Sequence, residues 1–105
     1  MRTYYVDNGK GYKMAFYNIV DARKYAAMLL DEVVKHEPNS VKDIIYTKSH
    51  GVPIYTSKRQ FIGTVIRFVN YYDWQKKGYG FEYIEYDPKY GTKHVPMLRN
   101  GKLER

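Results

Sequence analysis

The chain has 105 residues, a length that fits one small domain over residues 1–105 and leaves no room for a separate catalytic domain. Its 44% hydrophobic and 28% charged content is typical of a globular protein and argues against a wholly disordered chain. Its 18 Lys and Arg residues exceed its 11 Asp and Glu residues, which gives a formal net charge of +7. Composition therefore predicts a small basic module.

The chain contains no cysteine, which excludes disulfide scaffolds, thiolate zinc sites, iron–sulfur clusters and cysteine nucleophiles. Because small secreted domains often depend on disulfides, this composition favours an intracellular, cytoplasmic location. The longest mostly apolar stretch, residues 61–69, falls far below the roughly 20 residues of a membrane-spanning helix. We therefore expect no association with a membrane.

The first elements in chain order are predicted to form a β-hairpin. Residues 3–7 and 12–17 are short runs that contain aromatic and β-branched side chains. Between them lies the segment Asn8-Gly9-Lys10-Gly11, and Asn-Gly between two such runs is a strong hairpin signal.

The spacing of apolar residues then changes and predicts an amphipathic helix over residues 19–36. Asn18 is suited to cap its first turn, and Asp21 carries a negative charge toward the positive end of the helix dipole. The apolar stripe contains Ile19, Ala22, Ala26, Leu29 and Val33, widened by Tyr25 and Leu30. The polar side is expected to contain Arg23, Lys24, Asp31 and Lys35.

The remainder of the chain carries β-type runs and no second helical pattern. Pro53 indicates that the run 52–56 lies at a sheet edge or begins a strand. Both alternating sets of the run 61–72 are apolar, which predicts a central strand, and Gly63 indicates a bulge or a close backbone approach within it. Residues 99–105 are expected to form a polar tail. The predicted strands are residues 43–48, 52–56, 61–72, 81–86 and 92–98.

These elements predict an α+β fold with the order β-β-α-β-β-β-β-β, in which one helix packs on a mainly antiparallel sheet. Helix residues such as Ala22 and Ala26 should face Val65, Ile66 or their neighbours. The strands could instead curl toward a barrel. An edge strand at Val52–Thr56 or Thr92–Leu98 could pair with a second copy of the chain and form a homodimer.

No residue pattern predicts catalysis, a metal site or a cofactor. His36, His50 and His94 do not stand at metal-ligand spacing, and Ser49 beside His50 does not make a nucleophile–base pair. A metal-dependent nuclease would need clustered carboxylates. A nuclease that uses Asp43, His50 or His94 is therefore the least favoured hypothesis, and we expect a protein that is not an enzyme.

A run of cations interleaved with aromatic residues begins at Lys48. No acidic residue occurs between Lys48 and Arg67. Cations bind phosphates regardless of base sequence, and flat rings stack on unpaired bases. The predicted binding residues are Lys48, Lys58, Arg59, Arg67, Tyr71, Tyr72, Trp74, Lys76, Lys77 and Tyr79.

This patch favours a small non-enzymatic protein that contacts nucleic acid. The alternative is a phage-type inhibitor of a host defence or nucleic-acid-processing enzyme, similar to an anti-CRISPR protein. In that case the rings would anchor a protein interface and the cations would meet an acidic or nucleic-acid-lined surface. The sequence carries no RNA-recognition, zinc-finger or helix-turn-helix signature that would decide between them.

Overall fold

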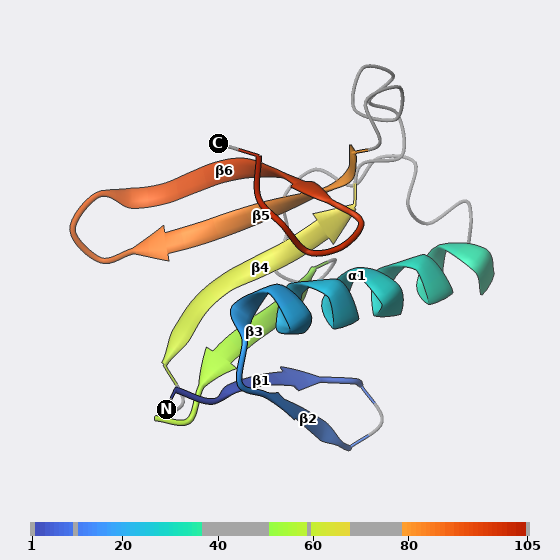
Figure 1. Ribbon diagram of the computed structural model, residues 1–105, viewed down its shortest axis with the longest axis horizontal. Helices are drawn as coiled ribbons and strands as arrows, with labels where there is room; N and C mark the ends of the chain where they lie inside the picture. The colour runs from blue at the N-terminus through green and yellow to red at the C-terminus, as the bar shows by residue number, and fades with distance from the viewer. Residues whose placement is uncertain (1, 10, 37–50, 59, 68–78, 105) are drawn as a thin grey trace.

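One α-helix packs on one face of a six-stranded antiparallel sheet in the computed structural model of the chain (Figure 1). The structure describes residues 2–9, 11–36, 51–58, 60–67 and 79–104, without the side chains of 33–36, 67, 79 and 80. The fold is therefore α+β, as the sequence predicts. The expected strand 43–48, and the part of 61–72 beyond residue 67, lie outside the described residues.

The sheet is open and has the strand order β2-β1-β3-β4-β5-β6, with antiparallel pairing between all neighbours. The sheet does not close into a barrel, because β2 and β6 form its two edges. The elements are β1 (Tyr4–Asp7), β2 (Lys13–Phe16), α1 (Ile19–His36), β3 (Val52–Thr56), β4 (Phe61–Arg67), β5 (Tyr79–Asp87) and β6 (Gly91–Leu98).

The N-terminal hairpin and the start of the helix follow their local sequence signals. Gly9 and Gly11 both adopt positive φ angles, 76° and 89°, in the turn between β1 and β2. The side-chain Oδ1 of Asn18 accepts a hydrogen bond from the backbone amide of Val20 at 2.7 Å, as expected of an N-cap. The predictions of the hairpin, the cap and the bounds of α1 are confirmed.

The hydrophobic core lies between α1 and the sheet. Alanines at the contact allow the helix backbone to approach the strands closely. Ala22 and Ala26 pack in one cluster with Val65, as predicted. Ile66 is also buried, but it is not a member of this cluster. The buried cluster contains Ala22, Ala26, Ala27 and Leu30 of the helix and Val6, Ile54, Val65, Phe81, Tyr83 and Met97 of the strands.

Arg23 was expected on the polar side of the helix, and this prediction is wrong. The residue is only 8% exposed, and its guanidinium carbon lies 4.4 Å from the ring centroid of Tyr83. A long arginine side chain can bury its methylene groups and place its charge over an aromatic face. This contact outweighs the tendency of a charged residue to face water.

Tyr83 packs directly against the backbone of Gly63. A Cβ atom at Gly63 would collide with the Tyr83 ring, and the Tyr83 hydroxyl donates a hydrogen bond to the carbonyl of Ile62 at 3.3 Å. The pairing of β3 with β4 also shifts register next to this point, between Ile54 and Tyr55. The expected bulge and close backbone approach at Gly63 are therefore both present.

Strand β3 lies inside the sheet, between β1 and β4, so the edge expected at Val52–Thr56 is wrong, whereas the alternative that Pro53 begins a strand is correct, because it is the second residue of β3. The pairing with β1 extends only from Thr56 to Ile54. Pro53 lies one residue beyond this pairing, so its missing amide hydrogen removes no hydrogen bond to β1. The edge expected at Thr92–Leu98 is confirmed, because β6 is the last strand of the sheet.

The C-terminal segment folds back onto the domain and does not extend away from it as a tail (Figure 1). Leu103 forms a bridge with Met97, and the amide of Glu104 donates to the carbonyl of Pro96 at 2.8 Å. Gly101 is buried against the Val20 carbonyl at the start of α1. These contacts cover part of the outer edge of β6.

Candidate nucleic-acid interface

Four aromatic residues from four adjacent strands lie on the sheet face opposite α1. Successive side chains of a strand point to opposite faces, and their neighbours Val6 and Ile54 point into the core under the helix. Tyr5 and Tyr55 are direct cross-strand partners on the other face. We call this set the aromatic row, and it consists of Tyr5 (β1), Tyr55 (β3), Phe61 (β4) and Tyr86 (β5).

Three rings of the aromatic row contact one another across the strands, and Tyr5 is placed beside Tyr55 by the register of β1 and β3. The centroids of Tyr55 and Phe61 are 5.8 Å apart, and those of Phe61 and Tyr86 are 6.1 Å apart. These distances and the tilted arrangements are typical of favourable aromatic pairs. Tyr86 is 48% exposed, whereas the other three rings are partly buried. The row therefore presents ring surface to solvent while it is braced from within the sheet.

The irregularity in β4 is what brings Phe61 into the row. Regular alternation from Gly63, which faces Tyr83 on the helix side, would place Phe61 on the helix side as well. The register shift inserts Ile62 as an extra residue, so Ile62 packs against the core and Phe61 pairs with Tyr55. The β-bulge thus places the Phe61 ring on the face opposite α1, between Tyr55 and Tyr86.

A shallow hollow of about 420 Å³ lies at one end of the aromatic row. Asp7 and Lys13 are cross-strand partners and are both exposed, and Lys58 is exposed in the turn that joins β3 to β4. One cation, Lys13, therefore lies at the rings on this side of the sheet. The hollow is lined by Tyr5, Asp7, Lys13, Tyr55, Thr56 and Ser57.

Most of the binding residues predicted from sequence lie where the structure gives no placement, so the predicted patch stays a prediction. Lys58 is exposed in the turn between β3 and β4. Arg67 and Tyr79 are placed only by their backbones, at the end of β4 and the start of β5, which is the opposite end of these strands from Phe61 and Tyr86. The residues outside the described ranges are Lys48, Arg59, Tyr71, Tyr72, Trp74, Lys76 and Lys77.

The charge of the chain is distributed unevenly between its described and undescribed parts. Among residues with described side chains, Lys and Arg nearly balance Asp and Glu. Most of the net charge of +7 therefore comes from the other segments, which include Lys48, Arg59, Lys76 and Lys77. The aromatic row belongs to the sheet. The remaining surplus is divided between the segments that join the strands, which include Arg59, Lys76 and Lys77, and three cations elsewhere, which are Lys35 in α1, Arg67 at the end of β4 and Arg105 at the C-terminus.

Sequence reasoning did not identify Tyr5, Phe61 and Tyr86 as members of a binding surface. Each residue alone fits a β-strand equally well on either face. Alternation within β1 and β5 separates the two faces, but the neighbours across the sheet depend on the strand order and on the bulge in β4. No local signal in the chain encodes that order.

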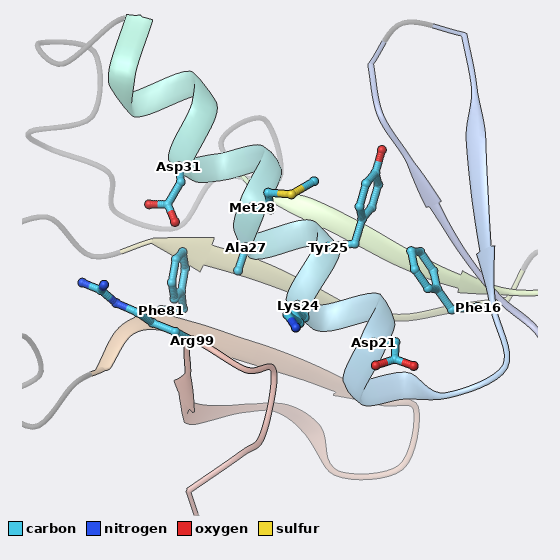
Figure 2. Close-up of a pocket in the computed structure, with 9 residues that line it drawn as sticks. All are labelled: Phe16, Asp21, Lys24, Tyr25, Ala27, Met28, Asp31, Phe81 and Arg99. Carbon is cyan, nitrogen blue, oxygen red and sulfur yellow. The ribbon is translucent and has the colours of Figure 1, made fainter.

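A second hollow, of about 440 Å³, lies along the outer side of α1. In Figure 2, Phe16, Tyr25 and Met28 lie on one side of the helix, and Phe81 and Arg99 lie on the other. The charged residues that line this hollow are of both signs, Asp21, Lys24, Asp31 and Arg99. Because these charges balance, electrostatics alone do not favour a polyanion on this surface.

Glu82 is a buried carboxylate on the same sheet face as the aromatic row. It is 4% exposed, and its Oε2 lies 3.1 Å from Nδ1 of His94 on β6. Burial raises the pKa of Glu82 above its ordinary value, and the nearby His94 opposes part of this shift. His94, one of the residues of the nuclease hypothesis, thus contacts a carboxylate, whereas Asp43 and His50 lie outside the described residues.

The raised pKa of Glu82 predicts how stability depends on pH. Because its pKa is raised, Glu82 binds its proton more tightly in the folded state than in the unfolded state. Glu82 therefore stabilises the fold most below about pH 4.3, the ordinary pKa of a glutamate side chain. This contribution to the free energy of unfolding is lost as pH rises through the folded-state pKa. We expect Glu82→Gln to remove this decline in the free energy of unfolding with rising pH. Urea unfolding of both proteins from about pH 4 to pH 8 measures it. Glu32→Gln, at an exposed position on α1, should keep the decline, and an unchanged profile in Glu82→Gln would contradict the assignment.

Comparisons of the chain with protein-family models, curated proteins and solved structures find no match. Among the described residues, no three His, Asp or Glu side chains lie close enough together to share a metal ion. In the same part of the chain, no helix combines the length and the apolar character needed to cross a membrane.

Proposed function

We propose that this protein is a small, basic, non-enzymatic module that binds nucleic acid on the sheet face opposite α1. The observation that carries the proposal is the aromatic row, which crosses four strands and ends at exposed Tyr86. Aromatic side chains on the face of a sheet can stack on unpaired bases, because every base has a flat π surface. Such a surface selects for single strands without selecting strongly for sequence.

The net charge supports the same proposal. Lys13 lines the hollow at one end of the row, and Lys58 is exposed in the turn that joins β3 to β4. Arg59, Lys76 and Lys77 stand in segments that connect strands of the same sheet. Lysine and arginine bind phosphates and release the counterions condensed on the nucleic acid. An intracellular, cytoplasmic location, which the lack of cysteine favours, is part of the proposal.

Titration of labelled oligonucleotides with the full chain tests this function. We expect tighter binding to a single strand than to a duplex of the same length, because paired bases cannot reach the rings. Affinity should fall steeply as salt rises from about 50 to 200 mM, since each neutralised phosphate releases counterions. Fluorescence anisotropy measures both effects. No binding of either oligonucleotide at about 50 mM salt would overturn the proposal.

A second candidate function is a phage-type inhibitor that binds a host protein. The observation that favours it is the exposed apolar surface around β2 and α1. Met14 on β2 is 41% exposed, and Met28 on α1 is 51% exposed and lines a hollow together with Phe16 and Tyr25. Exposed apolar patches often mark protein interfaces. A stoichiometric host partner captured after nuclease treatment would favour this function over nucleic-acid binding.

A homodimer through the sheet edge is compatible with either function. Among the described residues, Leu103 and Glu104 contact the outer edge of β6 at Met97 and Pro96, so Gly91 to Val95 is the part of this edge that would pair with a second strand. Sedimentation of the purified chain distinguishes a dimer from a monomer.

A further inference from the structure

The hollow at the end of the aromatic row has the size and the chemistry of a site for one base. Its volume of about 420 Å³ lies within the usual range of roughly 300–1,000 Å³ for small-ligand sites. The register places Tyr5 beside Tyr55 in the middle of the hollow. Asp7 and Lys13 lie toward one end, and Ser57 lies toward the other. Two rings are thus combined with a carboxylate, an ammonium group and a hydroxyl.

The turn that follows β1 holds Asp7 in place. Its Oδ1 accepts a hydrogen bond from the backbone amide of Gly9 at 2.8 Å. An ionised carboxylate has about four acceptor positions over its two oxygens, so this bond occupies only part of its capacity. The rest of the group lines the hollow as a hydrogen-bond acceptor that cannot donate.

An acceptor-only group discriminates among bases. Cytosine, adenine and guanine carry exocyclic amino groups that donate hydrogen bonds, whereas thymine presents a carbonyl oxygen at the equivalent position. A carboxylate attracts the amino group and repels the carbonyl oxygen. Lys13, the cross-strand partner of Asp7, places a positive charge where it can meet the phosphate next to the bound base.

We propose that this hollow binds one unpaired base with an exocyclic amino group. The base stacks at Tyr5 and Tyr55, its amino group donates to the Asp7 carboxylate, and the neighbouring phosphate contacts Lys13. The inference rests on the proposed function and adds a base preference to it. The protein should therefore favour single strands rich in cytosine or adenine over strands made only of thymine.

Anisotropy titrations of the full chain with labelled oligo-dC, oligo-dA and oligo-dT of equal length test this inference. We expect oligo-dC and oligo-dA to bind roughly tenfold more tightly than oligo-dT, as one well-placed polar contact to a base permits. Asp7→Asn should abolish the preference, because an amide can both donate and accept. The variant keeps an oxygen that can accept from the Gly9 amide, so the turn is retained.

Asp87→Asn is the matched control for this experiment. Asp87 holds its own turn in the same way, with its Oδ1 accepting from the Lys89 amide at 2.8 Å, but it does not line the hollow. Removal of its charge should raise all three affinities equally and leave the preference intact. Equal affinities of the unmodified chain for all three strands would overturn the inference and leave nucleic-acid binding in place. Binding to none of them would overturn both, and a preference that persists in Asp7→Asn would overturn the role of Asp7.

Discussion

Replacement of Gly63 with alanine should lower the free energy of unfolding by roughly 1–3 kcal/mol or more, the usual cost of forcing extra atoms into a packed core. A Cβ atom at this position would lie 2.6 Å from Cε2 of Tyr83 and still closer to the hydroxyl end of the ring. Tyr83 is only 2% exposed, and Arg23 lies over its ring, so the ring has little space to move away. The loss should therefore exceed that of an ordinary surface substitution.

Urea unfolding of Gly63→Ala, Tyr83→Phe and the double variant measures this effect and assigns its cause. Because Tyr83→Phe removes the hydroxyl that is nearest to the new methyl group, the two changes should cost less together than their separate losses predict. Gly91→Ala is the control, since Gly91 has a φ of 83° but no atom within 4 Å of the place that a Cβ would occupy. It tests backbone strain without a collision. A stability of Gly63→Ala equal to that of the unmodified protein would contradict the packing argument.

The features that the sequence predicts correctly depend on residues close together in the chain. The Asn8-Gly9 turn needs only its own backbone angles, and the cap at Asn18 needs only the amide of Val20. The helix period is likewise contained within residues 19–36. Each of these signals is complete before the rest of the chain folds, so neither the sheet order nor the far end of the protein can alter it.

The features that the sequence does not predict depend on distant partners. The interior position of β3 follows from its pairing with β1, some 50 residues earlier in the chain. The burial of Arg23 depends on Tyr83, which lies three strands further along the chain. The candidate site also depends on distant partners. The aromatic row forms only when β1, β3, β4 and β5 lie side by side and the bulge in β4 places the Phe61 side chain on the face opposite α1.

The predicted basic patch and the aromatic row belong to different parts of the chain. Trp74 and the lysines at 76 and 77 give the predicted patch its basic and aromatic character, and they lie outside the described residues. Lys58 is the predicted residue whose side chain the structure describes, and it is exposed in the turn that joins β3 to β4. A binding surface that combines both parts would use the sheet to stack bases and the connecting segments to neutralise phosphates.

Replacement of Tyr86 with alanine should weaken single-strand binding by roughly 5- to 150-fold, which corresponds to the 1–3 kcal/mol that one base–ring stack contributes. Tyr86 is the most exposed ring of the row and is braced by Phe61. Tyr86→Phe should retain most of the affinity, because stacking needs the ring and not the hydroxyl. Duplex binding should change little, since phosphate contacts dominate there.

Tyr90→Ala is the matched control for the loss at Tyr86. Tyr90 is 78% exposed, more than Tyr86, and lies four residues later in the turn between β5 and β6. Its ring faces Lys89 Nζ at 5.3 Å and takes no part in the row. Anisotropy titrations at one salt concentration compare the variants, and urea unfolding shows that each still folds. Equal losses at Tyr86 and Tyr90 would mean that exposed tyrosines contribute wherever they lie, and the aromatic row would then have no special role in binding.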